Sequence, residues 1–219
     1  MSPQAPQTGK MENPPDSYLT LGTSATAEIK IQRSRFIGVA APAADEAEAR
    51  EFIQQQARIY HDSRHACYGW RLGTAATITE KRNDDGEPSG TAGEPILAEI
   101  RKLELTQTVV VVVRYFGGIK LGTGGLARAY GQAAAEALAA APIRTVLQGS
   151  TFAMIFPYAL QKTLGYLLAQ FAGHPVKEEY GAEVTWTIWL PHSRAKAFES
   201  ALTETTAGVV QLVQTPSSK

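Results

Sequence analysis

Cations and glycines are concentrated in one stretch, "RYFGGIKLGTGGLARAYG", which runs from Arg114 to Gly131. It joins an apolar run to an alanine-rich segment with a helical pattern. A glycine-rich turn between a strand and a helix directs free backbone N–H groups and the positive end of the helix dipole toward one point, which favours a phosphate or a carboxylate. We therefore predict an anion-binding or nucleic-acid-binding site made by Arg114, Gly117, Gly118, Lys120, Gly122, Thr123, Gly124, Gly125 and Arg128.

The same glycines have a structural alternative, because glycine also permits tight turns and close packing of a helix on a sheet. The segment "GGIKLGTGG" does not end in Gly-Lys-Ser or Gly-Lys-Thr, as a P-loop would. It also lacks the first strand and the later acidic residue of the dinucleotide fingerprint. Nucleotide hydrolysis is therefore not indicated, and we expect no cofactor.

A second reactive pattern is "HDSRHACYGW", which holds His61, His65 and Cys67. Two histidines four residues apart can bind a divalent metal on a helix, but the local pattern is that of a strand, so we expect no metal site. On a strand, His65 and Cys67 lie on one face, which would allow a base to activate a thiol. The alternative is an inert cysteine in an apolar strand.

The third pattern is the acidic loop "NDDGEPSGTAGEP", with Asp84, Asp85 and Glu87. Its carboxylates could perform acid–base chemistry, hold a cation or pair with the cations of the glycine-rich stretch. Alternatively, they bond backbone groups in a solvated turn. If these motifs form one cleft, the catalytic candidates are His65, Cys67, Asp84, Asp85 and Glu87.

Periodicity predicts the elements that position these residues in the first half. Five consecutive valines without alternation indicate a central strand covered on both faces. The expected elements are a hairpin at 25–41, a helix at 43–60, strands at 64–72 and 75–79, a polar loop at 80–93, a helix at 94–103, the valine strand at 106–116 and a helix at 126–141.

The second half predicts strand, helix, strand, strand, helix, strand, which is the ferredoxin-like order. The expected ranges are 151–156, 158–171, 175–181, 182–190, 193–205 and 208–213. On the strand at 182–190, Trp186 and Trp189 fall on opposite faces, so at most one of them belongs to the core. The other is a candidate contact with a protein partner.

Composition restricts the class of protein. The chain has 219 residues, with 21 basic and 21 acidic side chains, so any nucleic-acid binding must come from a local patch. The single cysteine excludes an intramolecular disulfide and fits a reducing compartment. No apolar run reaches the roughly 18 residues of a membrane span, and the first residues lack the apolar core of a signal peptide. We expect a cytoplasmic protein with no membrane partner.

Two long motifs, "DDGEPSGTAGEPIL" and "VVVVVRYFGGIKLGTGGLARAYG", occur in the order and spacing of the IMPACT family, and "RHACYGW" and "SRFIG" also look like that family. The segment "EEYGAEVTWTIWLP" resembles the small C-terminal domain of the bacterial YigZ branch. The resemblance implies an α+β protein of two domains. The first would be a two-layer α/β sandwich like domain 2 of a small-subunit ribosomal protein, and the second would be ferredoxin-like.

With this resemblance, we expect a disordered tail at 1–17, the IMPACT domain at 18–144, the ferredoxin-like domain at 148–213 and a disordered tail at 214–219. Eukaryotic relatives regulate translation by binding a kinase activator through an additional N-terminal domain, to which nothing in this sequence corresponds. The leading hypothesis is a translation-linked protein that binds RNA, the ribosome or a translation-regulating partner. The alternative is an enzyme with a His/Cys/Asp cleft that acts on a small molecule.

Overall fold

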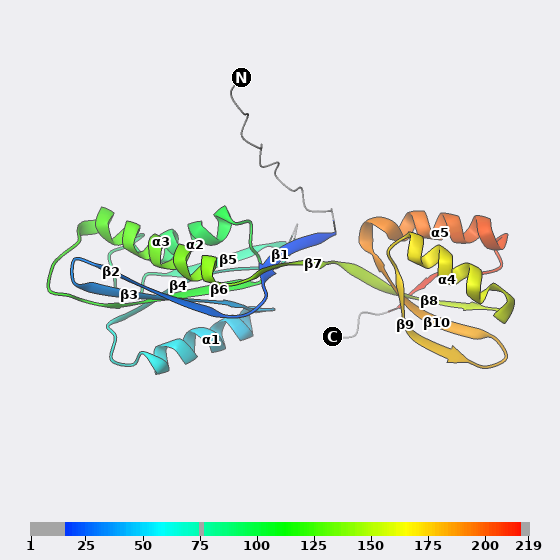
Figure 1. Cartoon of the computed structure of the whole chain (residues 1–219), viewed down its shortest axis with the longest axis horizontal. Helices are drawn as coiled ribbons and strands as arrows, with labels where there is room; N and C mark the ends of the chain where they lie inside the picture. The colour runs from blue at the N-terminus through cyan, green and yellow to red at the C-terminus, as the bar shows by residue number, and fades with distance from the viewer. Residues whose placement is uncertain (1–15, 75–76, 216–219) are drawn as a thin grey trace, which may run out of the picture. The chain divides into compact units, whose positions relative to one another are not determined.

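The computed structural model describes residues 16–74 and 77–215. The chain forms two compact units, Tyr18–Val146 and a second unit that contains Leu147–Lys219 with residues up to Ser17 (Figure 1). Each unit has its own hydrophobic core, since no cluster of buried residues in the described part of the chain draws on both. The predicted α+β fold of two domains is confirmed.

The first unit is built on a five-stranded sheet in which every neighbouring pair is antiparallel. The valine strand lies at its centre, as its continuous apolar pattern predicted. In spatial order the strands are β2 (Ala25–Ile31), β3 (Ser34–Pro42), β6 (Thr108–Tyr115), β4 (His65–Leu72) and β5 (Thr79–Asn83).

Helices cover both faces of this sheet. Helices α2 (Gly93–Lys102) and α3 (Gly122–Ala140) lie on one face, and α1 (Glu46–Ile59) lies on the other (Figure 1). Val110 and Val112 of β6 face the core beneath α2 and α3, while Val109 belongs to the smaller cluster on the α1 side. Helix α1 therefore adds a third layer to the expected sandwich of sheet and helices.

Two strand glycines set how close α2 and α3 come to the sheet. A Cβ added at Gly38 would lie 2.3 Å from the carbonyl oxygen of Ala133 in α3. One added at Gly69 would lie 3.0 Å from the backbone nitrogen of Leu97 in α2. The first distance is too short for a real Cβ and the second is at the limit, so glycine at these two positions allows α3 and α2 to pack directly on the sheet.

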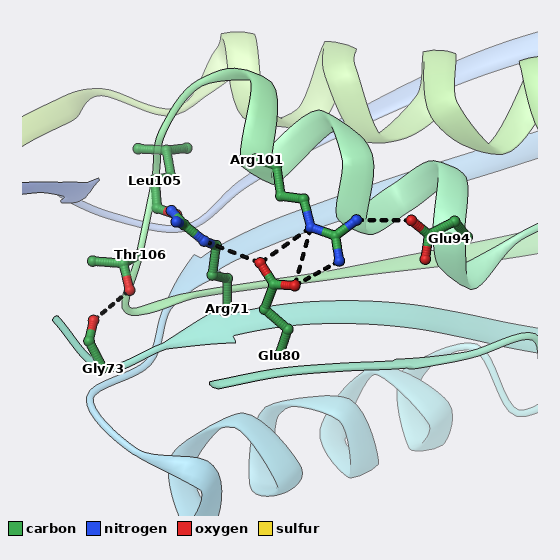
Figure 2. Close-up of polar contacts among 7 residues, drawn as sticks. All are labelled: Arg71, Gly73, Glu80, Glu94, Arg101, Leu105 and Thr106. Atoms are coloured by element: carbon green, nitrogen blue, oxygen red, sulfur yellow. Dashed lines mark hydrogen bonds and ion pairs between the residues drawn. The ribbon is translucent and has the colours of Figure 1, made fainter. Parts of the chain in front are cut away.

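Strand β5 corrects one prediction. It runs over Thr79–Asn83 and so occupies the start of the predicted polar loop, while residues 75–76 of the predicted strand lie outside the described residues. All five of its residues are exposed, so it carries no apolar alternation. Figure 2 shows what holds this edge instead: the Glu80 carboxylate lies between Arg71 of β4, at 3.1 Å, and Arg101 of α2.

The same close-up shows how α2 and the neighbouring loops are tied to that edge. Arg101 also contacts Glu94, its partner in α2, at 2.7 Å, and Arg71 donates to the carbonyl of Leu105 at 2.9 Å (Figure 2). These side chains are partly exposed, and each surface ion pair contributes only a fraction of a kcal/mol, up to about 1 kcal/mol. The network therefore positions the edge of the sheet more than it stabilises the unit.

The second unit has the predicted ferredoxin-like arrangement. Its sheet has the order β11-β8-β10-β9, with antiparallel pairing throughout, and one face of it is buried against α4 and α5. The final strand is shorter and lies later than the predicted 208–213, and its last residue, Gln214, pairs with Phe152 although the sequence assigned it to the C-terminal tail. The elements are β8 (Gly149–Phe156), the short η2 (Tyr158–Leu160), α4 (Gln161–Gln170), β9 (His174–Tyr180), β10 (Val184–Pro191), α5 (His192–Thr206) and β11 (Val213–Gln214).

The two tryptophans of β10 face opposite ways, as predicted. Trp186 is buried and packs edge-on against Phe156. Trp189 lies on the other face, partly exposed and stacked on His174 with ring centroids 5.2 Å apart.

A two-stranded ribbon pairs β1 (Ser17–Leu21) with β7 (Ile143–Leu147). Ser17, which the sequence assigned to the N-terminal tail, therefore begins a strand. Asp16 is buried, and its carboxylate accepts a hydrogen bond from the backbone N–H of Ser193 at 2.8 Å. The rest of that predicted tail and residues 216–219 lie outside the described residues.

Candidate functional site

A pocket of about 410 Å³ lies in the first unit, where β6 ends and α3 begins. Charged and polar side chains, among them Glu87 and Thr123, occupy part of its wall, and apolar side chains occupy the rest. The lining residues are Arg64, His65, Glu87, Pro88, Arg114, Phe116, Lys120, Leu121, Gly122, Thr123 and Leu126. The structure thus brings the glycine-rich stretch next to members of both other motifs.

The glycines of the loop serve different purposes. A Cβ at Gly117 would lie 2.0 Å from the backbone carbon of Arg33, so this position passes directly against the β2–β3 turn. Gly118 and Gly122 have φ of +87° and +70°, which side chains other than glycine rarely adopt. At Gly124 an added Cβ would meet nothing closer than 3.8 Å, so neither close packing nor a positive φ requires glycine at this position. The structural alternative therefore accounts for part of the motif only.

Helix α3 begins at Gly122, one turn earlier than predicted, so the second half of the loop forms its first turn. No side chain caps this N-terminus and its first turn holds no acidic residue. The first N–H groups of a helix have no partner within it, and together with the helix dipole they attract an anion. Gly122 and Thr123, the first two residues of the helix, line the pocket.

Arg114 reaches the pocket from the end of β6 and is only partly available to a ligand. Its Nη1 donates to Glu87 Oε1 at 2.7 Å, and the two side chains are 9% and 5% exposed. Tyr130 donates its hydroxyl to the same oxygen at 2.8 Å. The Nε of Arg114 is buried without a hydrogen-bond partner in the described structure. One donor of Arg114 therefore remains unsatisfied, and the nitrogen that carries it is buried.

Cys67 does not have the environment of a nucleophile. Its side chain is fully buried, and its thiol donates to the carbonyl oxygen of Asp84 at 2.9 Å. Burial, and then the neighbouring carboxylates, raise the pKa of the Cys67 thiol to about 12, against a partial lowering by Tyr130. A reactive cysteine requires the opposite shift, toward the thiolate.

The two aspartates of the acidic loop bond the backbone, as the structural alternative for that loop proposed. Asp84 accepts from the N–H groups of Ala92 and Gly93 at 2.9 and 2.8 Å, at the N-terminus of α2. Desolvation raises its pKa, but these bonds and one from Gly90 outweigh it, so the pKa of Asp84 is lowered. Asp85 accepts from the N–H of Ala66 at 2.7 Å. Neither carboxylate lines the pocket.

His65 is the catalytic candidate that lies in the pocket beside Glu87. Its Nδ1 is 2.7 Å from the carbonyl oxygen of Asp85. Because a carbonyl only accepts, Nδ1 carries the proton, which leaves Nε2 as the atom that can engage a ligand. With Cys67 buried and both aspartates bound to backbone, the set His65, Cys67, Asp84, Asp85 and Glu87 does not converge on one reacting position.

The predicted anion-binding residues divide into two groups. Arg114, Lys120, Gly122 and Thr123 line the pocket, whereas Gly117, Gly118, Gly124, Gly125 and the exposed Arg128 do not. Sequence reasoning missed Arg64 and Phe116, although each lies next to a residue that it selected. Within residues 16–74 and 77–215, no group of three His, Cys, Asp or Glu side chains is placed to hold a metal ion.

Comparison with known proteins identifies the family. The Impact N-terminal domain matches residues 32–138, and a domain of unknown function (DUF1949) matches residues 154–209. The IMPACT family member YigZ of Escherichia coli (strain K12) is 32% identical over 199 residues, which cover 90% of this chain and 98% of YigZ. The chain belongs to the IMPACT family.

Other members match in sequence and in structure. The IMPACT family member YvyE of Bacillus subtilis (strain 168) is 48% identical over 122 residues, so the match spans little more than half of each chain, 56% in both cases. A solved structure described as that of a hypothetical protein aligns over 93% of this chain and 99% of its own, with 30% identity and a TM-score of 0.63. Every residue that lines the pocket lies within the matched Impact N-terminal domain.

Among the helices that the structure describes in this IMPACT family protein, none combines the length and the apolar character needed to cross a bilayer.

Proposed function

We propose that this IMPACT family protein is a translation-linked regulatory protein that binds RNA, free or in the ribosome, through the pocket at the N-terminus of α3. The observation that carries the proposal is the uncapped helix end, which faces a pocket that also holds Arg64, Arg114 and Lys120. Helix N–H groups and cations around one concave site are the usual arrangement for phosphate. The link to translation rests on the family resemblance.

The electrostatics of the chain favour a local interaction over bulk attraction. Formal net charge is zero, whereas the pocket wall holds three cations against the single carboxylate of Glu87. Two or three phosphate contacts on single-stranded RNA would give a log–log salt slope between about −1.4 and −2.1, at roughly 0.7 per phosphate. Binding of this kind is weak, so a folded RNA or the ribosome would supply the remaining contacts.

The test is co-sedimentation with ribosomes and with total RNA across a salt series. The double variant Arg64→Ala/Lys120→Ala removes two exposed cations of the pocket, and Arg128→Ala removes an exposed cation of α3 outside it. We expect wild type and Arg128→Ala to bind at low salt and to dissociate as salt rises. The double variant should bind at least tenfold more weakly at every salt concentration.

Arg114 is unsuitable for this test. Its removal would leave Glu87 buried without its partner, which costs about 3–5 kcal/mol and could unfold the unit. Equal binding by wild type and the double variant, or no binding by wild type at low salt, would contradict the proposal. Circular dichroism of each variant shows whether a loss of binding occurs in a folded protein.

A further inference from the structure

We infer that the pocket is specific for a phosphomonoester on a nucleoside, the form in which a terminal nucleotide of RNA presents its phosphate, and that it does not read the diesters within a chain. The inference rests on the proposed function, because both use the pocket at the N-terminus of α3. It adds the chemical class of the group that enters the pocket.

The first argument is the depth at which the donors lie. Arg114 lines the pocket although its side chain is nine-tenths buried, so its guanidinium is recessed. A phosphodiester within a chain is esterified on both sides, so both links must leave the site along the surface. A phosphomonoester has one ester link and three free oxygens, so it can enter end-on and offer an acceptor to a recessed guanidinium.

The second argument is charge. Arg64, Arg114 and Lys120 line the pocket with only Glu87 to oppose them, which leaves an excess of two positive charges. A phosphomonoester carries between about −1.5 and −2 at pH 7, because its second pKa is about 6. A diester carries a single charge. The dianion therefore matches the pocket better, and it also gains more from the dipole of α3.

The third argument is the apolar part of the pocket wall. Pro88, Leu121 and Leu126 line it, together with Phe116, whose side chain is 49% exposed. A half-exposed aromatic ring can stack on a nucleobase. The volume of about 410 Å³ is at the lower end of the range for small-molecule pockets, roughly 300–1,000 Å³. The pocket thus suits one nucleotide, with the phosphate at the helix end and the base against Phe116.

The experiment measures binding of the full chain to one short labelled RNA in three forms, with a 5′-phosphate, a 3′-phosphate or hydroxyls at both ends. Adenosine monophosphate and inorganic phosphate serve as competitors, which separates a free nucleotide from an RNA end as the source of the group. We expect one phosphorylated form to bind at least tenfold more tightly than the hydroxyl form. We also expect adenosine monophosphate to displace that form from the protein.

Three variants locate the effect. Lys120→Ala should remove most of the preference for the phosphorylated end, while the matched control Arg128→Ala, exposed on α3 outside the pocket, should keep it. Phe116→Ala should weaken the binding of adenosine monophosphate at least threefold more than that of inorganic phosphate, because the ring is the proposed partner of the base, although it also packs on the Arg114 guanidinium. All three positions are exposed, so the variants are expected to fold.

The outcomes separate this inference from the proposed function. Equal binding of phosphorylated and hydroxyl RNA, weakened in both cases by Lys120→Ala, overturns the phosphomonoester specificity and leaves RNA binding in place. Binding of adenosine monophosphate without binding of any RNA form supports the specificity and overturns the proposed function. Absence of binding to every probe overturns both.

Discussion

At the scale of single residues, the pocket combines side chains whose partners are already in the protein with side chains that have room for a ligand. Arg114 is bound to Glu87 and its guanidinium lies 5.4 Å from the ring centroid of Phe116. Lys120 and Arg64 are exposed at the same pocket. The buried pair therefore helps to shape the site, and the exposed cations supply charge that substitution can remove without unfolding the unit.

Cys67 allows a prediction about reactivity at this scale. Its pKa of about 12, against an ordinary value of 9.0, reduces the thiolate fraction at pH 8 by about a thousandfold, and burial also blocks access. Alkylation of the native protein by iodoacetamide at pH 8 should be at least about 100-fold slower than that of the urea-denatured chain. Mass spectrometry of timed samples measures both rates; similar rates would mean that the thiol is accessible and activated in the fold.

At the scale of elements, Asp84 connects the acidic loop to a helix end. Its carboxylate accepts hydrogen bonds from the N–H groups of Ala92 and Gly93, where α2 begins, and from the N–H of Gly90 in the preceding loop. The backbone carbonyl of the same residue accepts a hydrogen bond from the thiol of Cys67 in β4. One residue thus joins the loop, the helix and the sheet, which explains the local sequence without any catalytic role for its carboxylate.

Asp84→Ala should lower the free energy of unfolding by about 1–3 kcal/mol at pH 7, because three backbone donors lose a charged acceptor. The pKa of Asp84 is lowered below its ordinary 3.8 in the folded chain, so its stabilisation is complete above about pH 4 and is lost as pH falls through the lower folded value. The difference between wild type and variant should therefore shrink toward pH 3.

Urea denaturation at pH 7 and pH 3 provides the measurement. Glu51→Ala, at an exposed position of α1, is the matched control and should change stability by less than about 0.5 kcal/mol. A difference that is absent at pH 7, or the same at both pH values, would show that the carboxylate of Asp84 does not cap α2 as described.

At the scale of the whole molecule, each unit has its own hydrophobic core, and the candidate site belongs to the first unit. The buried cluster of the second unit, from Met154 to Val210, draws only on that unit, and the candidate site lies entirely in Tyr18–Val146. A separate core is the physical condition for independent folding. We propose that the IMPACT domain at 18–144 and the ferredoxin-like domain at 148–213 are independent folding units.

A fragment of residues 147–219 should unfold cooperatively on heating. We expect it to be less stable than the same unit in the full chain, because it lacks the bonds from Asp16 to Ser193 and Gln148. Thermal circular dichroism of this fragment and of the full chain provides the comparison. A broad transition without a cooperative midpoint would contradict independent folding.

More of the secondary structure than of the candidate site could be predicted from the sequence. Hydrophobic periodicity predicted the central strand β6, the helices and the ferredoxin-like order, because those patterns record which residues are buried. It misplaced β5, whose exposed polar residues are held at the sheet edge by ion pairs and carry no apolar alternation. It also began α3 one turn late, since glycine has a low helix propensity.

The sequence by itself determined the family, the two-domain α+β organisation and the presence of a glycine-rich loop between a strand and a helix, because local pattern and long motifs carry that information. Only the tertiary structure decided which side chains meet. It paired Arg114 with Glu87, 27 residues away, buried Cys67, brought Arg64 and Phe116 into the pocket and left Arg128 outside. Such contacts join distant segments, and their formation depends on how helices and strands pack, which no local periodicity records.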